Sequence, residues 1–161
     1  MSGRQAKTNA ARFLDGLGTP YELLTCQIDP ADLSAETAAV ALGLPPEMVY
    51  KTLLLRGSDS TLLEACLPAD RELDLKALAK AAGLRSAALA PLKELFPLTG
   101  YRRGGCSPFG GKRRFPLFVH EDVVLLDKMA VNAGAVGLMF LMKPDDFLRA
   151  GEGVLAPIVK I

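Results

Sequence analysis

A lysine lies within the otherwise mainly apolar stretch MVYKTLLLR, residues 48–56. The period of a β-strand places Lys51 on the same face as Val49, Leu53 and Leu55. A buried ammonium group that has no partner costs several kcal/mol, even after the surroundings relax. Lys51 therefore either lies at a sheet edge and extends its amine to water, or faces a cleft in which an anion binds it.

A second candidate is the glycine-rich segment TGYRRGGCSPFGGKRRFP, residues 99–116. The adjacent Gly104 and Gly105 allow the backbone to approach a ligand closely and to offer N–H donors. The segment lacks the endings and spacings of a Walker loop and of a dinucleotide-binding fingerprint. Both a ligand-binding loop and a simple β-turn fit this composition.

Positive charge is concentrated in the same region. No acidic residue lies between Glu94 and Glu121, a span that contains five cations: Arg102, Arg103, Lys112, Arg113 and Arg114. Such a cluster, interleaved with aromatic residues, suits the backbone of a polyanion, although solvated loop charges give the same pattern. The net charge of +1 and the pI of about 7.7 argue against a general nucleic-acid coating protein.

Short elements must position these groups. Helix signals cover residues 4–16, 34–43, 73–83, 91–96 and 144–151, with Ser34 and Asp74 as N-caps and glycines after several ends. Strand patterns cover residues 20–28, 48–56, 61–68, 86–90, 116–120, 123–127, 129–134, 137–143 and 154–160. The order lacks a regular βαβ alternation. We therefore predict an α+β fold in one domain, residues 1–161, with a mixed, barrel-like sheet and peripheral short helices.

The composition, half hydrophobic and 23% charged over 161 residues, is typical of a soluble globular protein. The longest apolar run, residues 133–142, is too short to span a bilayer, and the first residues lack an apolar signal region. We expect a cytoplasmic protein with no membrane partner. Three scattered cysteines and one histidine predict reduced thiols, and neither a metal site nor a cofactor.

Three motifs, taken in order, resemble the YbaK/EbsC family: VYKTLLL at 49–55, LDLKALAKAAG at 73–83 and TGYRRGGCSPFG at 99–110. These proteins are free-standing aminoacyl-tRNA deacylases, related to the editing domain inserted in bacterial prolyl-tRNA synthetases. The resemblance runs from Phe13 to the C-terminus and includes VNAGAVGL at 131–138. It implies the YbaK fold and an enzyme that hydrolyses the ester of mischarged tRNA.

The resemblance also implies roles for individual residues. Lys51 would face the editing pocket and meet the tRNA 3′ end, at a phosphate or at the ester. Backbone N–H groups of Gly104 and Gly105 are candidates to stabilise the oxyanion, a role in which one donor is worth roughly 10²–10³ in rate. The further candidates for substrate binding are Cys26, Tyr50, Thr52, Ser107, Pro108, Asn132 and Gly134. The five cations Arg102, Arg103, Lys112, Arg113 and Arg114 are the candidates for tRNA binding.

The sequence departs from the cysteine-specific members of the family. A frequent tyrosine falls on Cys26, a pocket serine on Asn132 and an acidic residue on Met139. The pocket is then less polar, which argues against strict cysteine specificity and favours small neutral amino acids. Together with the resemblance, this implies a substrate such as alanine or cysteine carried by tRNA(Pro). Water would attack an alanyl ester, whereas the thiol of an esterified cysteine could cleave its own ester and leave as a thiolactone.

Two other readings stay open. One is a non-catalytic module that keeps the fold and binds the tRNA 3′ end. The other is a thiol-dependent hydrolase with Cys106 as nucleophile and His120 as base, although we expect Cys106 to be a packed residue and Ser107 to hold the loop. Mischarged aminoacyl-tRNA is the expected partner and prolyl-tRNA synthetase a second candidate; DNA is not expected.

Overall fold

The computed structural model describes residues 7–161. The α-helices are α1 (Asn9–Leu17), α2 (Ala35–Leu42), α3 (Leu75–Ala82), α4 (Leu92–Thr99) and α5 (Pro144–Gly151). Two 3₁₀ helices are η1 (Pro46–Met48) and η2 (Glu121–Leu125). The strands are β1 (Glu22–Thr25), β2 (Val49–Gly57), β3 (Leu62–Pro68), β4 (Ala87–Leu89), β5 (Leu117–His120), β6 (Met129–Ala135), β7 (Leu138–Met142) and β8 (Val154–Ala156).

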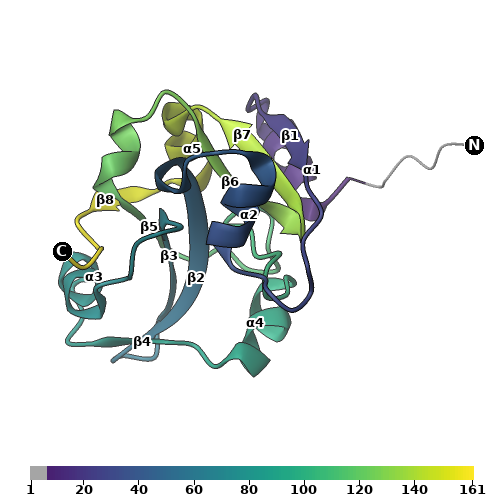
Figure 1. Cartoon of the computed structure of the whole chain (residues 1–161). Helices are drawn as coiled ribbons and strands as arrows, with labels where there is room; N and C mark the ends of the chain where they lie inside the picture. Colours follow the sequence, from purple (N-terminus) through teal and green to yellow (C-terminus); the bar gives the residue numbers. More distant parts are fainter. Residues whose placement is uncertain (1–6) are drawn as a thin grey trace, which may run out of the picture.

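One mixed sheet contains all the strands (Figure 1). Their order is β1-β7-β6-β2-β3-β5-β8, and β4 pairs with β2 outside this path. The β2–β3, β2–β4, β6–β7 and β1–β7 pairs are antiparallel, whereas β2–β6, β3–β5 and β5–β8 are parallel. The predicted α+β class, mixed sheet and short peripheral helices are confirmed. The sheet ends at β1 and β8, so its barrel-like form is open.

The helix caps follow the sequence signals. The side chains of Ser34 and Asp74 each accept a hydrogen bond from the backbone N–H three residues on, which satisfies a donor that has no partner within the helix. Gly43 and Gly83 follow the same two helices with φ of 68° and 70°, a conformation that glycine adopts without strain. Both helices therefore begin and end where the sequence predicts.

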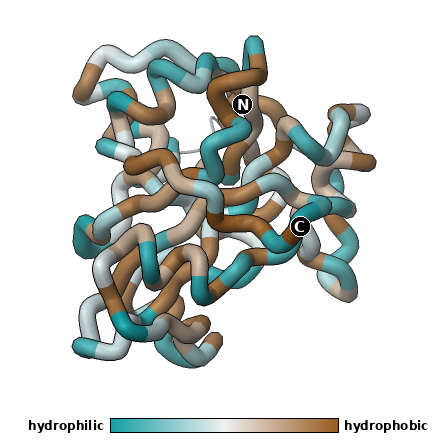
Figure 2. Tube along the Cα trace, turned by 90° about the vertical axis from the view of Figure 1, so that its left-hand side faces the viewer, coloured by the Kyte–Doolittle hydropathy of each residue, from teal (hydrophilic) through white to brown (hydrophobic). Residues whose placement is uncertain are grey.

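The sheet is buried on both faces. On one face, Tyr50 and Cys66 pack with residues of α1 and α5, including Phe147. On the other, Leu55 and Leu67 belong to a cluster that includes residues of α3, while α2 lies across the front of β2 (Figure 1). Hydrophobic and hydrophilic residues alternate in short runs along the trace (Figure 2), as expected for elements that bury one side.

Within residues 7–161, no helix is long and apolar enough to cross a membrane.

Some predicted boundaries were wrong. The strand expected at 123–127 is mainly the 3₁₀ helix η2, because the chain turns there between β5 and β6. The last strand keeps only Val154–Ala156 of the predicted 154–160. The first helix begins at Asn9 with Thr8 as its N-cap, and positions 4–6 of its predicted range lie outside the described residues.

Candidate functional site

The sheet has a gap beside the middle of β2. On one edge of β2, Tyr50 pairs with Val131 of β6, and Leu55 pairs with Leu89 of β4. Between these two points, positions 51–54 have no strand partner on that edge, and only Leu54 O accepts a backbone hydrogen bond there, from Ala90 N at 3.0 Å. Unpaired strand backbone is available to a ligand.

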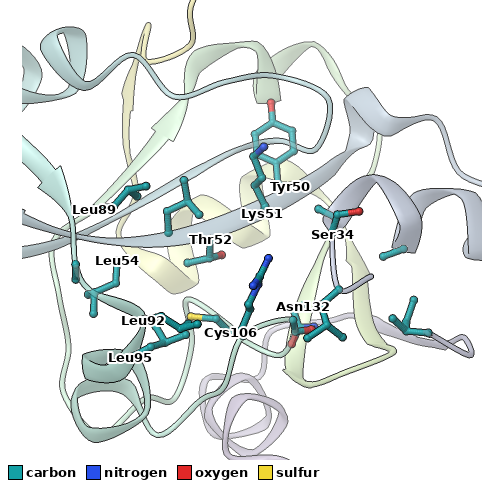
Figure 3. A pocket seen from close by; sticks show the side chains of 18 of the residues that line it. Ser34, Tyr50, Lys51, Thr52, Leu54, Leu89, Leu92, Leu95, Cys106 and Asn132 are labelled. Carbon is teal, nitrogen blue, oxygen red and sulfur yellow. The ribbon is translucent and has the colours of Figure 1, made fainter. Parts of the chain in front are cut away.

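A cavity of about 480 Å³ lies at this gap, within the size range of small-molecule sites. Residues from both faces of β2 line it: Figure 3 shows Lys51 on one side of the strand and Thr52 and Leu54 on the other. The remaining walls come from α2, the end of β4, the start of α4, the glycine-rich loop and the β6–β7 hairpin. Lys51 and the loop thus share one cavity, although β2 lies between the Lys51 and Thr52 side chains.

The charged lining of the cavity is entirely positive. Lys51 and Arg103 line it, and no carboxylate does so among the residues that the structure describes. Lys51 is half-buried, donates from Nζ to Ala69 O at 3.3 Å, and forms no ion pair within residues 7–161. β2 has strands on both sides, but Lys51 lies where one side of β2 is unpaired, so its amine lies at a gap within the sheet, beside the cavity, and not at an outer sheet edge. The cavity therefore offers two cations, and no carboxylate from the described residues, to an anionic ligand.

Asn132 fastens the glycine-rich loop to the sheet. Its Nδ2 donates to Gly104 O at 2.9 Å and to Ala135 O at 3.1 Å, while its Oδ1 accepts from Gly134 N at 2.6 Å. Gly104 has a φ of +82°, and a Cβ there would meet Leu33 Cβ at 3.0 Å. A larger residue at position 104 would therefore strain the turn and disturb the cavity wall.

Gly105 faces away from this cavity. Its N–H donates to Arg102 O at 2.9 Å, and the residue lines a second, smaller cavity of about 270 Å³ together with Gly134 and Phe96. The N–H of Gly105 is therefore already used, which corrects its expected role as an oxyanion donor. Within the described chain, the N–H groups of Gly104 and Cys106 have no protein acceptor.

The thiols at the site are buried and neutral. Burial raises the pKa of the Cys106 thiol, and the neighbouring Glu64 raises it further. Cys66, opposite Thr52 across the hairpin, has its Sγ 3.6 Å from Thr52 Oγ1, and burial raises the pKa of Cys66 to about 12. A buried thiol with a raised pKa is a poor nucleophile.

The predicted base for Cys106 is also misplaced. His120 does not line the cavity: its Nδ1 accepts from Ile158 N at 3.3 Å, and its Nε2 lies 3.3 Å from Asp122 Oδ2. The packing of Cys106 and the position of His120 therefore do not form a thiol–imidazole pair.

Several predicted substrate-binding residues lie beside the cavity rather than in it. Cys26 does not line it: its N–H donates to Gly137 O at 2.8 Å, and Ile28 lines the wall instead. Ser107 is buried and its Oγ accepts from Phe109 N at 3.3 Å, so it holds the loop as expected. Pro108 lines neither cavity. Tyr50 borders the cavity, but its ring is in the core and its Oη has no partner among the described residues.

The five cations do not form one patch. Arg103 lines the main cavity, whereas Arg102 Cζ and Lys112 Nζ lie 4.0 and 4.8 Å from the ring centroid of Phe96. Arg113 lies over Phe115, and Arg114 forms an ion pair of 3.3 Å with Glu152 near the end of α5. Only Arg102, Arg103 and Lys112 are therefore placed next to the two cavities.

Sequence reasoning missed most of the apolar wall of the site and one buried carboxyl group outside it. The wall residues that it missed are Ile28, Leu33, Ala35, Ala38, Leu89, Leu92 and Leu95, whereas Met139, which also lines the wall, was expected in the pocket. Nothing in the sequence distinguishes these residues, because the same apolar residue types also fill the core. The second feature is Glu64 of β3, which lines neither cavity and is 5% exposed, and whose carboxyl group has no hydrogen-bond or ion-pair partner in the described chain. Its position in an apolar strand pattern could have flagged it.

The chain resembles known proteins over nearly its whole length. Residues 29–150 match the model of a family described as the aminoacyl-tRNA editing domain. A relative from Enterococcus faecalis, named "Putative Cys-tRNA(Pro)/Cys-tRNA(Cys) deacylase EbsC", is 37% identical over 154 residues, which are 96% of this chain and 94% of the relative.

Solved structures share the fold. A crystal structure of a hypothetical protein superposes with a TM-score of 0.86 at 22% identity, covering 95% of this chain and 100% of that one. Another, reported as a "putative trans-editing enzyme for prolyl tRNA synthetase", has a TM-score of 0.82 at 20% identity, over 98% and 100% of the two chains. At these identities the two structures support the fold alone.

Proposed function

This chain belongs to the aminoacyl-tRNA editing domain family, within the YbaK/EbsC group, and from that premise we propose that it hydrolyses the ester of mischarged aminoacyl-tRNA. The observation that carries the proposal is the charge of the main cavity, where Lys51 and Arg103 have no carboxylate beside them among the described lining residues. The terminal nucleotide of tRNA supplies the matching anion, its phosphate.

The apolar wall of the cavity accepts the esterified amino acid. Ile28, Leu33 and Met139 line this wall with the small side chains of α2. An apolar pocket discriminates by size and separates neighbours by only about 1–3 kcal/mol per methylene. We assign to it a small neutral amino acid such as alanine or cysteine, carried by tRNA(Pro). Prolyl-tRNA synthetase is the partner that would deliver such a substrate.

The reaction needs no protein nucleophile. With an alanyl ester, water attacks the carbonyl carbon, the tetrahedral oxyanion collapses, and the ribose oxygen leaves with a proton. With a cysteinyl ester, the substrate's own thiol attacks the same carbon and forms a C–S bond, the ester C–O bond breaks, and the ribose oxygen leaves with the proton that the thiol gives up. The amino acid is then released as a cyclic thiolactone. The second route relies on proximity within the substrate, which the cavity walls would enforce.

Backbone geometry supports the loop as the oxyanion site. The N–H of Gly104 has no protein acceptor in residues 7–161, and the Gly104 carbonyl is fixed by Asn132. A preorganised donor of this kind stabilises negative charge as it develops on the carbonyl oxygen. Gly105, whose N–H closes the turn onto Arg102 O, is assigned to shaping the loop.

The test is deacylation of alanyl-, cysteinyl-, seryl- and threonyl-tRNA by the full-length protein and by Lys51→Met. We expect hydrolysis of at least one small-residue ester by the wild type and its loss in Lys51→Met, because the substrate phosphate loses a cation in a partly desolvated site. Lys76→Met, on the exposed surface of α3, is the matched control. Wild-type rates in Lys51→Met would end the assignment.

One observation favours a second candidate, a non-catalytic module that binds the tRNA 3′ end. No histidine or carboxylate lines the cavity within the described chain, so a water nucleophile has no side-chain base. The same assay separates the two functions. A binding module would hold aminoacyl-tRNA with a steep salt dependence and protect its ester instead of cleaving it.

A further inference from the structure

The second cavity lies directly behind the loop that lines the first. The chain from Arg102 to Gly105 separates them: Arg103 and Gly104 line the main cavity, while Arg102 and Gly105 line the second. Consecutive residues of one turn thus reach two neighbouring cavities. A flexible, extended ligand bound in the first cavity can continue over this turn into the second.

An exposed aromatic ring forms part of the second cavity. Phe96 of α4 is 40% exposed, and the guanidinium carbon of Arg102 lies 4.0 Å from its ring centroid. At this distance the guanidinium rests on the ring by a cation–π contact, which fixes the orientation of an otherwise flexible side chain. Lys112 Nζ, 4.8 Å from the same centroid, adds a second cation.

The rest of the cavity wall is largely backbone. Gly100, Gly105 and Gly134 all line it, and a Cβ on Gly105 would meet the backbone of Ala135 and Val136 at 3.1 Å. The loop and the β6–β7 turn can approach only because position 105 lacks a side chain. No acidic residue lines this cavity among the residues described.

Resting on the proposed function, we propose that the second cavity binds the nucleobase that precedes the terminal adenosine of tRNA, stacked on the Arg102–Phe96 pair. Planar guanidinium groups and aromatic rings are the surfaces on which proteins stack unpaired RNA bases. The phosphate that joins this nucleotide to the terminal one lies at the turn, within reach of the Arg103 side chain.

The kinetic test uses two substrates of different length, aminoacyl-tRNA and a 3′-aminoacyl-adenosine 5′-monophosphate, which keeps the terminal phosphate but lacks the preceding nucleoside. Phe96→Ala and Arg102→Lys should raise the KM for aminoacyl-tRNA by about 10- to 100-fold, the range of one lost base stack. Both variants should keep the wild-type rate on the aminoacyl-adenosine monophosphate. The controls are Leu125→Ala, an exposed apolar residue of η2, and Arg149→Lys on α5. An unchanged KM for tRNA in both variants would overturn the subsite.

A binding arm keeps the inference testable if no ester is cleaved. Fluorescence anisotropy would compare an RNA oligonucleotide that ends in CCA with one in which the base before the final adenosine is missing. Wild-type protein should bind the intact oligonucleotide more tightly, and Phe96→Ala should bind both equally, as in a double-mutant cycle. Equal binding of both by the wild type refutes the subsite. If the wild type cleaves no ester but still binds the intact oligonucleotide more tightly, only the proposed hydrolase activity is refuted.

Discussion

Glu64 is a buried carboxyl group, and the pH dependence of stability tests whether it is protonated in the folded protein. It lies on β3 opposite Leu54 of β2 and beside Leu117 of β5, and only 5% of it is exposed. Burial without a compensating cation raises its pKa to about 8 from the ordinary 4.5. The titratable groups near it, Cys66, Cys106 and Tyr101, are neutral, and Glu64 itself raises the pKa of each. We therefore predict a protonated Glu64 at neutral pH.

The direction of the pH effect follows from proton binding. Between pH 4.5 and about 8, the folded protein holds a proton on Glu64 that the unfolded chain has released. The free energy of unfolding therefore falls as the pH rises through this window, by about 1.4 kcal/mol per pH unit. Over a pKa rise of about 3.5, from 4.5 to about 8, the full effect is on the order of 5 kcal/mol.

Glu64→Gln removes this titration while keeping the shape of the side chain. Its free energy of unfolding, measured by urea denaturation from pH 5 to pH 9, should decline less steeply than that of the wild type. A buried amide has its own desolvation penalty, but that penalty is the same at every pH, so the slope is the readout. Glu47→Gln, at an exposed position, is the control. Parallel profiles for wild type and Glu64→Gln would refute the reasoning.

Three further predictions concern the loop and the cavity. Gly104→Ala should lower the free energy of unfolding by about 1–3 kcal/mol, the range for a non-glycine residue in the left-handed region. It should also reduce deacylation, because the new Cβ would lie 3.0 Å from Leu33 Cβ in the cavity wall. Denaturation and deacylation assays on one preparation check both effects. Asn132→Ala removes the bonds to Gly104 O and Gly134 N, so kcat should fall while thermal stability drops by only a few degrees; wild-type kcat would show that the loop needs no such anchor. Cys106→Ala should keep most of the activity, since the Cys106 thiol of the wild type is buried and its pKa is raised. Complete loss of turnover in a folded variant would instead support Cys106 as the nucleophile.

Local signals in the sequence were sufficient for most elements. Caps such as Ser34 and Asp74 set helix ends because they satisfy backbone groups within a few residues. The β2–β3 hairpin is equally local, since its two strands are joined by the short turn around Asp59. The motifs with unusual residue types, Lys51 and the paired glycines, therefore fell on the correct strand and loop.

The cavity itself could not be predicted in this way. It exists because β6 pairs with β2 at Tyr50 and β4 pairs with it from Leu55, leaving a gap between two non-local contacts. Neither pairing has a sequence signal at short range, since the paired segments lie far apart along the chain, as Tyr50 and Val131 or Leu55 and Leu89 do. For the same reason Ile28 and Leu33 were not recognised as wall residues, while Cys26 was wrongly placed in the pocket.

The β2–β3 hairpin contains a half-buried lysine and a buried glutamate, and its register places their side chains on opposite faces of the sheet. Lys51 faces the same side as its partner Leu67, whereas Glu64 faces the other side with Leu54. The two side chains therefore cannot form an ion pair, and each must be stabilised separately. Glu64 keeps a proton, while Lys51 reaches the Ala69 carbonyl at the edge of an open cavity. A slip of one residue would bring both to one face and allow an ion pair, so the native register is what leaves Lys51 free for an anionic ligand.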